Sequence, residues 1–140
     1  MNGDKQTFPY VETLSAAGRK SLMPFMQIEL SLRGRSKMVS ALADSGASVN
    51  VLPFSIGQHL GAVWDDQPGP IPLGGNLAES DARGLVLIAS IGRLPPVRLV
   101  FAWTSSDASP VILGQTNFFA EFDVCFHQAR MRFEVGPKIL

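Results

Sequence analysis

The stretch Leu42-Ala43-Asp44-Ser45-Gly46-Ala47-Ser48 is the most informative part of this 140-residue sequence. It sets one acidic residue between the end of a strand-like segment and a run of small residues. An unpaired carboxylate is costly in an apolar environment, so Asp44 needs an explanation. A surface turn is one interpretation, because Asp, Ser and Gly are all common in turns. A functional carboxylate is the other, and the rest of the chain has to decide between them.

The segment before Asp44 has the pattern of a β-hairpin. Met26, Ile28, Leu30 and Leu32 alternate with polar residues, and a period of two is typical of a half-buried strand. Residues 33–36 supply a turn, and residues 37–43 return as a second strand that ends at Asp44.

The residues after Asp44 predict more short strands, one or two short helices and a long loop. An apolar run at 49–52 is followed by Pro53, which suits the first position of a helix over 54–60, and Gly61 ends that helix. Residues 65–84 are rich in Gly, Pro and Asp, and a loop of this length is often a binding loop or lid.

The C-terminal half predicts mostly strands. Residues 85–91 are nearly all apolar, which favours a strand buried on both faces. Thr116 is placed to cap a short helix that runs through Phe122. The remaining strands are expected at residues 97–103, 110–114, 122–127 and 130–135. Residues 1–22 are interpreted as an irregular N-terminal tail with a possible edge strand at 8–11, and residues 23–140 as a single domain.

Composition excludes several classes of protein. Hydrophobic residues make up 46% of the chain and charged residues 17%, which is typical of a globular domain. Twelve basic and twelve acidic residues cancel, so charge gives no reason to expect a nucleic-acid partner or an anionic membrane surface. No apolar run approaches the ~20 residues of a membrane helix, and no secretory signal is evident. We therefore expect a soluble cytoplasmic protein.

Few other side chains suggest chemistry. His59 and His127 are far apart in sequence, and no His/Cys spacing predicts a metal site, so no metal or other cofactor is expected. Cys125 lies between Val124 and Phe126 and is interpreted as a buried structural thiol. Asp65, Asp66, Asp81 and Asp107 lie in polar loops. Asp44 is therefore the one acidic residue that stands between an apolar strand and small residues.

The order of these elements resembles the retropepsin-like aspartic proteases. An apolar strand, Asp44-Ser45-Gly46-Ala47, a second apolar strand, a glycine-rich hairpin region and then Ile112-Leu113-Gly114 before a short helix occur in that order. The resemblance covers roughly residues 25–135 and favours an active-site loop over a surface turn. It implies an all-β fold: a closed, acid-protease barrel of short antiparallel strands with one or two short helices.

The resemblance also implies a function and residue roles. The chain would be an aspartic endopeptidase that acts on a polypeptide through a water molecule held by two carboxylates. Since the chain has one Asp-Ser-Gly copy, the second carboxylate would be Asp44 of another copy in a homodimer. Ser45, Gly46 and Ala47 would complete the active-site loop, and Ile112, Leu113 and Gly114 would support it. A flap near Leu73, Gly74, Gly75, Asn76, Leu77 and Ala78 would close over the substrate.

Two positions depart from the viral members of that family. Those members often carry an acidic residue four positions after the catalytic Asp and an Arg directly after the apolar-apolar-Gly segment. Here the two positions are Ser48 and Gln115, so both partners of that ion pair are absent together.

Two alternatives remain open at the level of sequence. The same fold could serve as a peptide-binding or dimerisation module without proteolytic turnover. The chain could also be an unrelated small β-barrel in which Asp44 is an ordinary turn residue.

Overall fold

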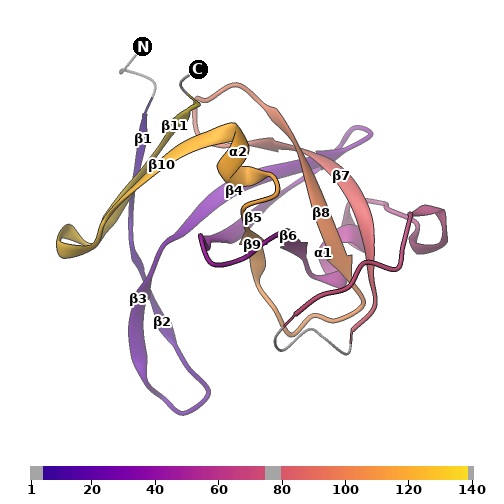
Figure 1. Ribbon diagram of the computed structural model, residues 1–140, viewed down its shortest axis with the longest axis horizontal. Coiled ribbons are helices and arrows are strands. Elements are labelled where there is room, and N and C mark those ends of the chain that lie inside the picture. Colours follow the sequence, from indigo (N-terminus) through magenta and orange to yellow (C-terminus); the bar gives the residue numbers. More distant parts are fainter. Residues whose placement is uncertain (1–4, 75–79, 139–140) are drawn as a thin grey trace.

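The computed structural model describes residues 5–74 and 80–138, and Figure 1 shows their arrangement. Within these residues the chain is mostly β-structure: a closed barrel, a three-stranded sheet and a two-stranded hairpin. Two short α-helices lie at Phe54–His59 (α1) and Phe118–Glu121 (α2), with 3₁₀ turns at Trp64–Asp66 and Gln128–Arg130. The predicted all-β closed barrel with one or two short helices is therefore confirmed.

Six strands close the barrel in the order β4, β5, β9, β6, β8 and β7. Their bounds are Phe25–Leu32 (β4), Arg35–Ala43 (β5), Asn50–Leu52 (β6), Ala82–Ser90 (β7), Val97–Thr104 (β8) and Val111–Leu113 (β9). Not every pair is antiparallel as expected, because β5–β9 and β6–β8 are parallel. The short strand β9 lies between β5 and β6, the two strands that flank the Asp44 loop.

Strands β4 and β5 form the predicted hairpin, paired from Phe25 and Leu42 to Leu32 and Arg35. Arg33 and Gly34 connect them with φ angles of 49° and 85°. Positive φ at both central residues is the type I′ turn, whose twist matches that of the two strands. The apolar residues of β4 point into the barrel, as their period of two predicts.

A separate sheet brings the two ends of the described chain together. It consists of β1 (Gln6–Pro9), β11 (Arg132–Pro137) and β10 (Phe122–His127) in that order, and all its pairs are antiparallel. Phe8 stacks on Phe133 with 5.4 Å between ring centroids, which anchors β1 to β11. The two final strands predicted from the sequence are thus present, and β1 is a third member of their sheet.

The prediction of an irregular N-terminal tail is wrong. Besides β1, this region contains a hairpin of β2 (Val11–Leu14) and β3 (Lys20–Met23), which projects from the barrel in Figure 1. Most of its side chains are exposed, so these strands carry little of the apolar alternation by which strands are recognised.

The barrel core is continuous with the packing of α1. Gly57 of α1 lies against Trp103, because a Cβ atom at this position would overlap the indole ring. The Trp103 indole N–H donates a hydrogen bond to the Phe54 carbonyl over 3.1 Å. The largest fully buried side chains are Trp103, Phe101, Phe118, Phe133, Ile28, Leu30, Leu52, Leu60, Leu87, Ile91, Leu99 and Leu113.

Two local predictions are wrong. Strand β7 is not buried on both faces, since Val86 and Ile88 are 45% and 39% exposed on the outside of the barrel. Helix α2 begins after Asn117 and not after Thr116, and no side chain caps it. The Asn117 side chain instead bonds the backbone of β8, accepting from Val100 N–H and donating to the Arg98 carbonyl.

None of the described helices combines the length and apolar character needed to cross a membrane.

Candidate active site

Asp44 follows directly after β5, in a tight turn fixed by three hydrogen bonds. Its backbone N–H donates to the Leu113 carbonyl over 3.0 Å, and its own carbonyl accepts from Ala47 N–H over 3.0 Å. Its Oδ1 atom accepts from Gly46 N–H over 2.9 Å. Asp44 is half-buried. A carboxylate that bonds the N–H two residues ahead makes an Asx-turn, so the sequence's turn interpretation describes the backbone here correctly.

Strand β9 and the residues after it lie against the Asp44 loop. Gln115 N–H donates to the Ala47 carbonyl and Thr116 N–H to the Ser48 carbonyl, each over 2.9 Å. Gly114 makes this close approach possible, because a Cβ atom there would lie 2.5 Å from the Val49 carbonyl oxygen. Ile112, Leu113 and Gly114 are therefore beside the loop that the sequence associated with them.

A buried asparagine connects the loop to the barrel and was missed in the sequence. Asn50 has no exposed surface. Its Oδ1 accepts from Gly114 N–H over 2.8 Å, while its Nδ2 lies 3.0 Å from the Val100 carbonyl and 3.3 Å from Asn117 Oδ1. The sequence did contain a signal, since Asn50 is a single amide residue inside the apolar run 49–52. If that run is buried, the amide needs hydrogen-bond partners.

Of the two positions that depart from the viral pattern, Gln115 makes a hydrogen bond to the Asp44 loop. Its side-chain amide donates to the Ser45 carbonyl over 2.8 Å, within the same chain. The residue after Gly114 therefore holds the Asp44 loop through a neutral hydrogen bond.

Two cavities meet at Asp44. One, of about 420 Å³, extends over the loop toward Pro72, Leu73 and Gly74. Its remaining lining residues are Gly46, Ala47, Ser48, Val49, Val51 and Ile112. Leu73 and Gly74, predicted near the tip of a flap, thus share a cavity with Asp44, whereas Gly75, Asn76, Leu77 and Ala78 lie outside the described residues.

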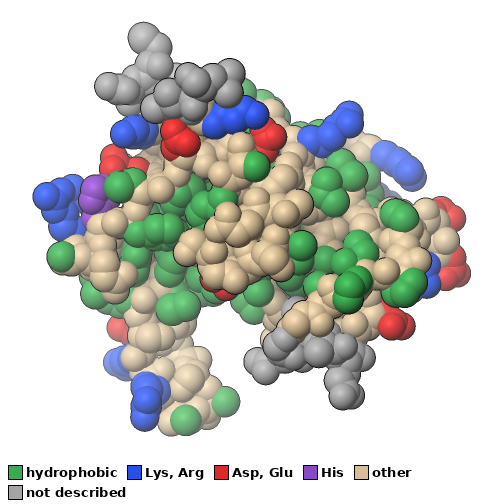
Figure 2. All heavy atoms as spheres, in the orientation of Figure 1, with side chains coloured by type: hydrophobic (Ala, Val, Ile, Leu, Met, Phe, Trp, Pro, Cys, Tyr) green, Lys and Arg blue, Asp and Glu red, His purple; other side chains and the backbone are tan. Residues whose placement is uncertain are grey.

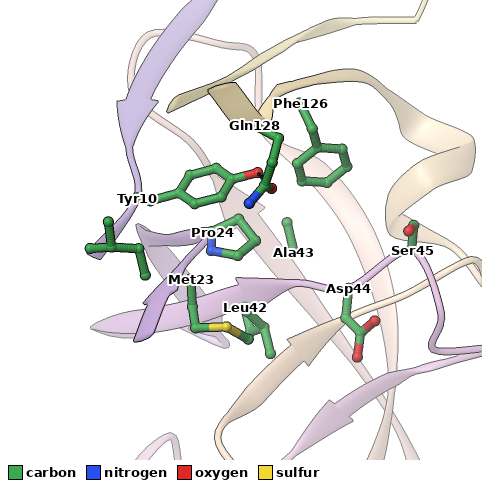
Figure 3. A pocket seen from close by; sticks show the side chains of 10 residues that line it. Tyr10, Met23, Pro24, Leu42, Ala43, Asp44, Ser45, Phe126 and Gln128 are labelled. Carbon is green, nitrogen blue, oxygen red and sulfur yellow. Dashed lines mark hydrogen bonds between the residues drawn. The ribbon is translucent and has the colours of Figure 1, made fainter. Parts of the chain in front are cut away.

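The other cavity, of about 380 Å³, shares only Asp44 with the first and is shown in Figure 3. It is lined by Tyr10, Leu22, Met23, Pro24, Leu42, Ala43, Asp44, Ser45, Phe126 and Gln128. Tyr10, Phe126 and Gln128 lie together across the cavity from Asp44 in this view, and the Tyr10 hydroxyl donates to Gln128 Oε1 over 3.2 Å. Asp44 is the one acidic residue among the described residues that line either cavity.

The side chains first set aside lie elsewhere. His59 is exposed at the end of α1, as expected for a surface histidine. Cys125 is exposed on β10, so the prediction of a buried structural thiol is wrong. His127 lies on the same strand and bonds Glu134 over 2.7 Å.

Comparison with known proteins gives the same fold. No protein-family model matches the chain, and no curated protein matches it. A retropepsin-like aspartic protease from Rickettsia conorii superposes with a TM-score of 0.60 at 15% sequence identity, over 95% of this chain and 93% of that one. The EIAV protease in complex with the inhibitor HBY-793 gives a TM-score of 0.45 at 18% identity, over 74% of this chain and 88% of that one.

The similarity to the Rickettsia conorii protease shows the fold and, at this level of identity, only the fold. The barrel is therefore of the retropepsin-like type and not of another architecture. This chain has the retropepsin-like fold, and it carries Asp44 on the loop between β5 and β6.

Proposed function

We propose that the protein is an aspartic endopeptidase whose catalytic residue is Asp44. The observation that carries this proposal is the position of Asp44, on a hydrogen-bonded loop of a retropepsin-like fold where it lines two cavities. A fixed loop suits a catalytic group, because catalysis requires the reacting atoms to be held in position.

Two carboxylates are needed for the reaction. The ionised one accepts a proton from a bound water, whose oxygen attacks the peptide carbonyl carbon, while the protonated one donates its proton to the carbonyl oxygen. Two carboxyl groups a few ångströms apart cannot both ionise readily, so they titrate as a pair that shares one proton. We therefore expect cleavage to be fastest at acidic to mildly acidic pH.

The second carboxylate would come from Asp44 of another copy, in a homodimer. Support comes from the cavities themselves, which among the described residues are lined by no other acidic side chain. A two-fold axis beside the loop would bring the two Asp44 residues together. The active site would then be complete only in the dimer.

Exposed apolar side chains next to this loop support the same arrangement. Leu22 of β3 and Phe126 of β10 line the cavity of Figure 3 and are 42% and 37% exposed. In Figure 2, hydrophobic side chains gather above the projecting hairpin, on the side of the three-stranded sheet. Strand β10 forms one edge of that sheet in the described chain. A second copy would cover this surface.

The substrate would be an extended polypeptide bound between the Asp44 loop and the segment that contains Leu73 and Gly74. Both face the cavity of about 420 Å³. Closure of that segment over the peptide would exclude bulk water from the reaction.

A peptide-binding or dimerisation module without turnover is the alternative function. One observation favours it: Asp44 already uses Oδ1 within its own turn, so the carboxylate could have a purely structural role. The two functions differ in whether peptide bonds are cleaved, and in whether that cleavage depends on the Asp44 carboxylate.

The test compares Asp44→Asn and Asp44→Ala with Asp65→Asn as a matched control. Asp65 is exposed and lines neither cavity at Asp44. With a mixed peptide library at acidic pH, we expect cleavage by the wild type and by Asp65→Asn, and none by the Asp44 variants at unchanged fold and sedimentation. Cleavage by purified Asp44→Asn protein would contradict the proposal, and binding without cleavage by the wild type would favour the alternative.

A further inference from the structure

Three potential metal ligands share the outer face of the three-stranded sheet. Cys125 of β10 is directly opposite Glu134 of β11, and His127 is two residues further along β10. Successive residues of a strand point to opposite faces, so Cys125 and His127 share one face of β10 and Phe126 points to the other. Phe126 lines the cavity next to Asp44, and these three side chains therefore lie on the side away from it.

The distances bring these side chains close to the geometry of one ion. One ligand atom from each of Cys125, His127 and Glu134 lies within 4.8 Å of the other two. His127 Nε2 and Glu134 Oε1 are 2.7 Å apart. Ligand atoms around a tetrahedral zinc ion are about 3.4–3.6 Å apart, from Zn–S of about 2.3 Å and Zn–N or Zn–O of about 2.0–2.2 Å. Side-chain rotations that move each atom by about 1 Å are enough to reach that arrangement.

The ligand types select the kind of ion. A thiolate, an imidazole and a carboxylate suit a borderline-soft divalent ion such as Zn²⁺, whereas Mg²⁺ and Ca²⁺ prefer oxygen ligands alone. Three protein ligands leave the fourth tetrahedral position to a water molecule. All three side chains reach solvent, since Cys125 is exposed and the His127 and Glu134 side chains are each 30% exposed, so an ion can enter.

Charged side chains near this cluster have two opposing effects on metal binding. The hydrogen bond from His127 lowers the pKa of Glu134 below its ordinary value, and the positive charges of Lys5 and Arg132 lower it further. Glu134 is therefore an anionic ligand at neutral pH. Lys5 and Arg132 also repel a divalent cation, and the negative charge of a Cys125 thiolate opposes that repulsion.

We propose that Cys125, His127 and Glu134 form a binding site for one Zn²⁺ ion per chain. The bound ion links β10 to β11 across the outer face of the sheet. It replaces the His127–Glu134 hydrogen bond by two metal–ligand bonds. The His127 nitrogen that binds the ion carries no proton, so its proton moves to the other ring nitrogen or to solvent, and the Cys125 proton is released to solvent. The site does not depend on Asp44, so it stands or falls separately from the proteolytic function.

Cobalt is the direct probe, because Co²⁺ takes the place of Zn²⁺ and a thiolate bound to Co²⁺ gives a charge-transfer band in the near ultraviolet. The chain has a single cysteine, so such a band can arise only from Cys125. We expect untagged, reduced wild-type protein to develop the band with one Co²⁺ per chain, to lose it on addition of Zn²⁺, and to unfold at higher temperature with Zn²⁺ present.

Variants of each ligand complete the test. We expect Cys125→Ser to abolish the band, and His127→Gln and Glu134→Gln each to weaken Co²⁺ binding by at least about tenfold. His59→Gln is the control, because this exposed histidine lies on α1 and should leave binding unchanged. The proposal is overturned if the wild type shows no band, if one ion binds two chains, or if His127→Gln and Glu134→Gln both bind as the wild type does.

Discussion

The side-chain amide of Gln115 donates a hydrogen bond to the backbone carbonyl of Ser45 over 2.8 Å. This contact connects the residue after β9 to the residue after Asp44. Both residues are exposed, so the bond contributes little to the free energy of unfolding. Its consequence is local, because it restrains the loop on which the proposed catalytic carboxylate stands.

We therefore expect Gln115→Ala to lower kcat by on the order of tenfold, since a small displacement of a reacting group is costly in rate. The free energy of unfolding should change by less than about 1 kcal/mol. Cleavage kinetics together with urea denaturation measure the two effects separately. Thr116→Ala is the control, and a Gln115→Ala enzyme with wild-type kcat would show that this bond does not position Asp44.

Unlike the Gln115 hydrogen bond, the hydrogen bonds of the buried Asn50 amide are expected to act mainly on the free energy of unfolding. Asn50→Ala leaves Gly114 N–H and the Val100 carbonyl without this partner in the interior, and we expect a loss of stability on the order of 2–3 kcal/mol. Urea denaturation against Gln58→Ala, which removes an exposed amide, measures it. Equal stability of the two variants would mean that the Asn50 bonds are not needed to hold β9 in place.

A substitution at Gly114 tests how closely β9 approaches the Asp44 loop. A Cβ atom there would lie 2.5 Å from the Val49 carbonyl oxygen and 2.8 Å from that of Ala47, and these are backbone atoms. We expect Gly114→Ala to lower the free energy of unfolding by about 1–3 kcal/mol. Gly74→Ala is the matched control for stability, since no atom lies within 4 Å of its added Cβ. A Gly114→Ala protein as stable as the control would contradict the packing described.

The His127–Glu134 pair predicts a pH dependence of stability in the presence of a chelator. The pKa of Glu134 is lower in the folded protein than its ordinary value, chiefly because of the hydrogen bond from His127. A carboxylate of this kind stabilises the fold above its ordinary pKa of 4.5, and that contribution is lost as the pH falls through the lower, folded value. We expect the difference in Tm between wild type and Glu134→Gln to shrink as the pH falls below about 4.5. A difference that stays constant from pH 7 to the acid limb would argue against the pair.

Much of the barrel could be predicted because its strands are buried on one face only. The alternation in residues 26–32 identified β4, and the same reasoning placed the return strand that ends at Asp44. The failure at β7 has a physical cause: Val86 and Ile88 are apolar but face outward, and an apolar run does not reveal which face the fold leaves uncovered.

Other features depend on contacts between distant residues and could not be predicted locally. Asn50 is explained only by partners 50 to 67 positions away in the sequence. The sequence indicated an edge strand at residues 8–11, but the bounds of β1, Gln6–Pro9, are set by its pairing with β11 from the other end of the chain. Cys125 was taken as buried from its apolar neighbours, yet it shares the outward face of β10 with His127. Proximity in space, and not sequence spacing, brings it to Glu134.

The central proposal is that two Asp44 carboxylates from two chains form one active site. The most direct measurement is proteolysis by wild-type chains refolded together with a ninefold excess of Asp44→Asn chains, at constant total protein. Random pairing leaves about one tenth of the wild-type chains in wild-type dimers, so we predict that activity per wild-type chain falls to about a tenth. The same excess of Asp65→Asn chains should leave activity per chain unchanged. Activity per wild-type chain that does not depend on added Asp44→Asn protein would contradict the paired active site.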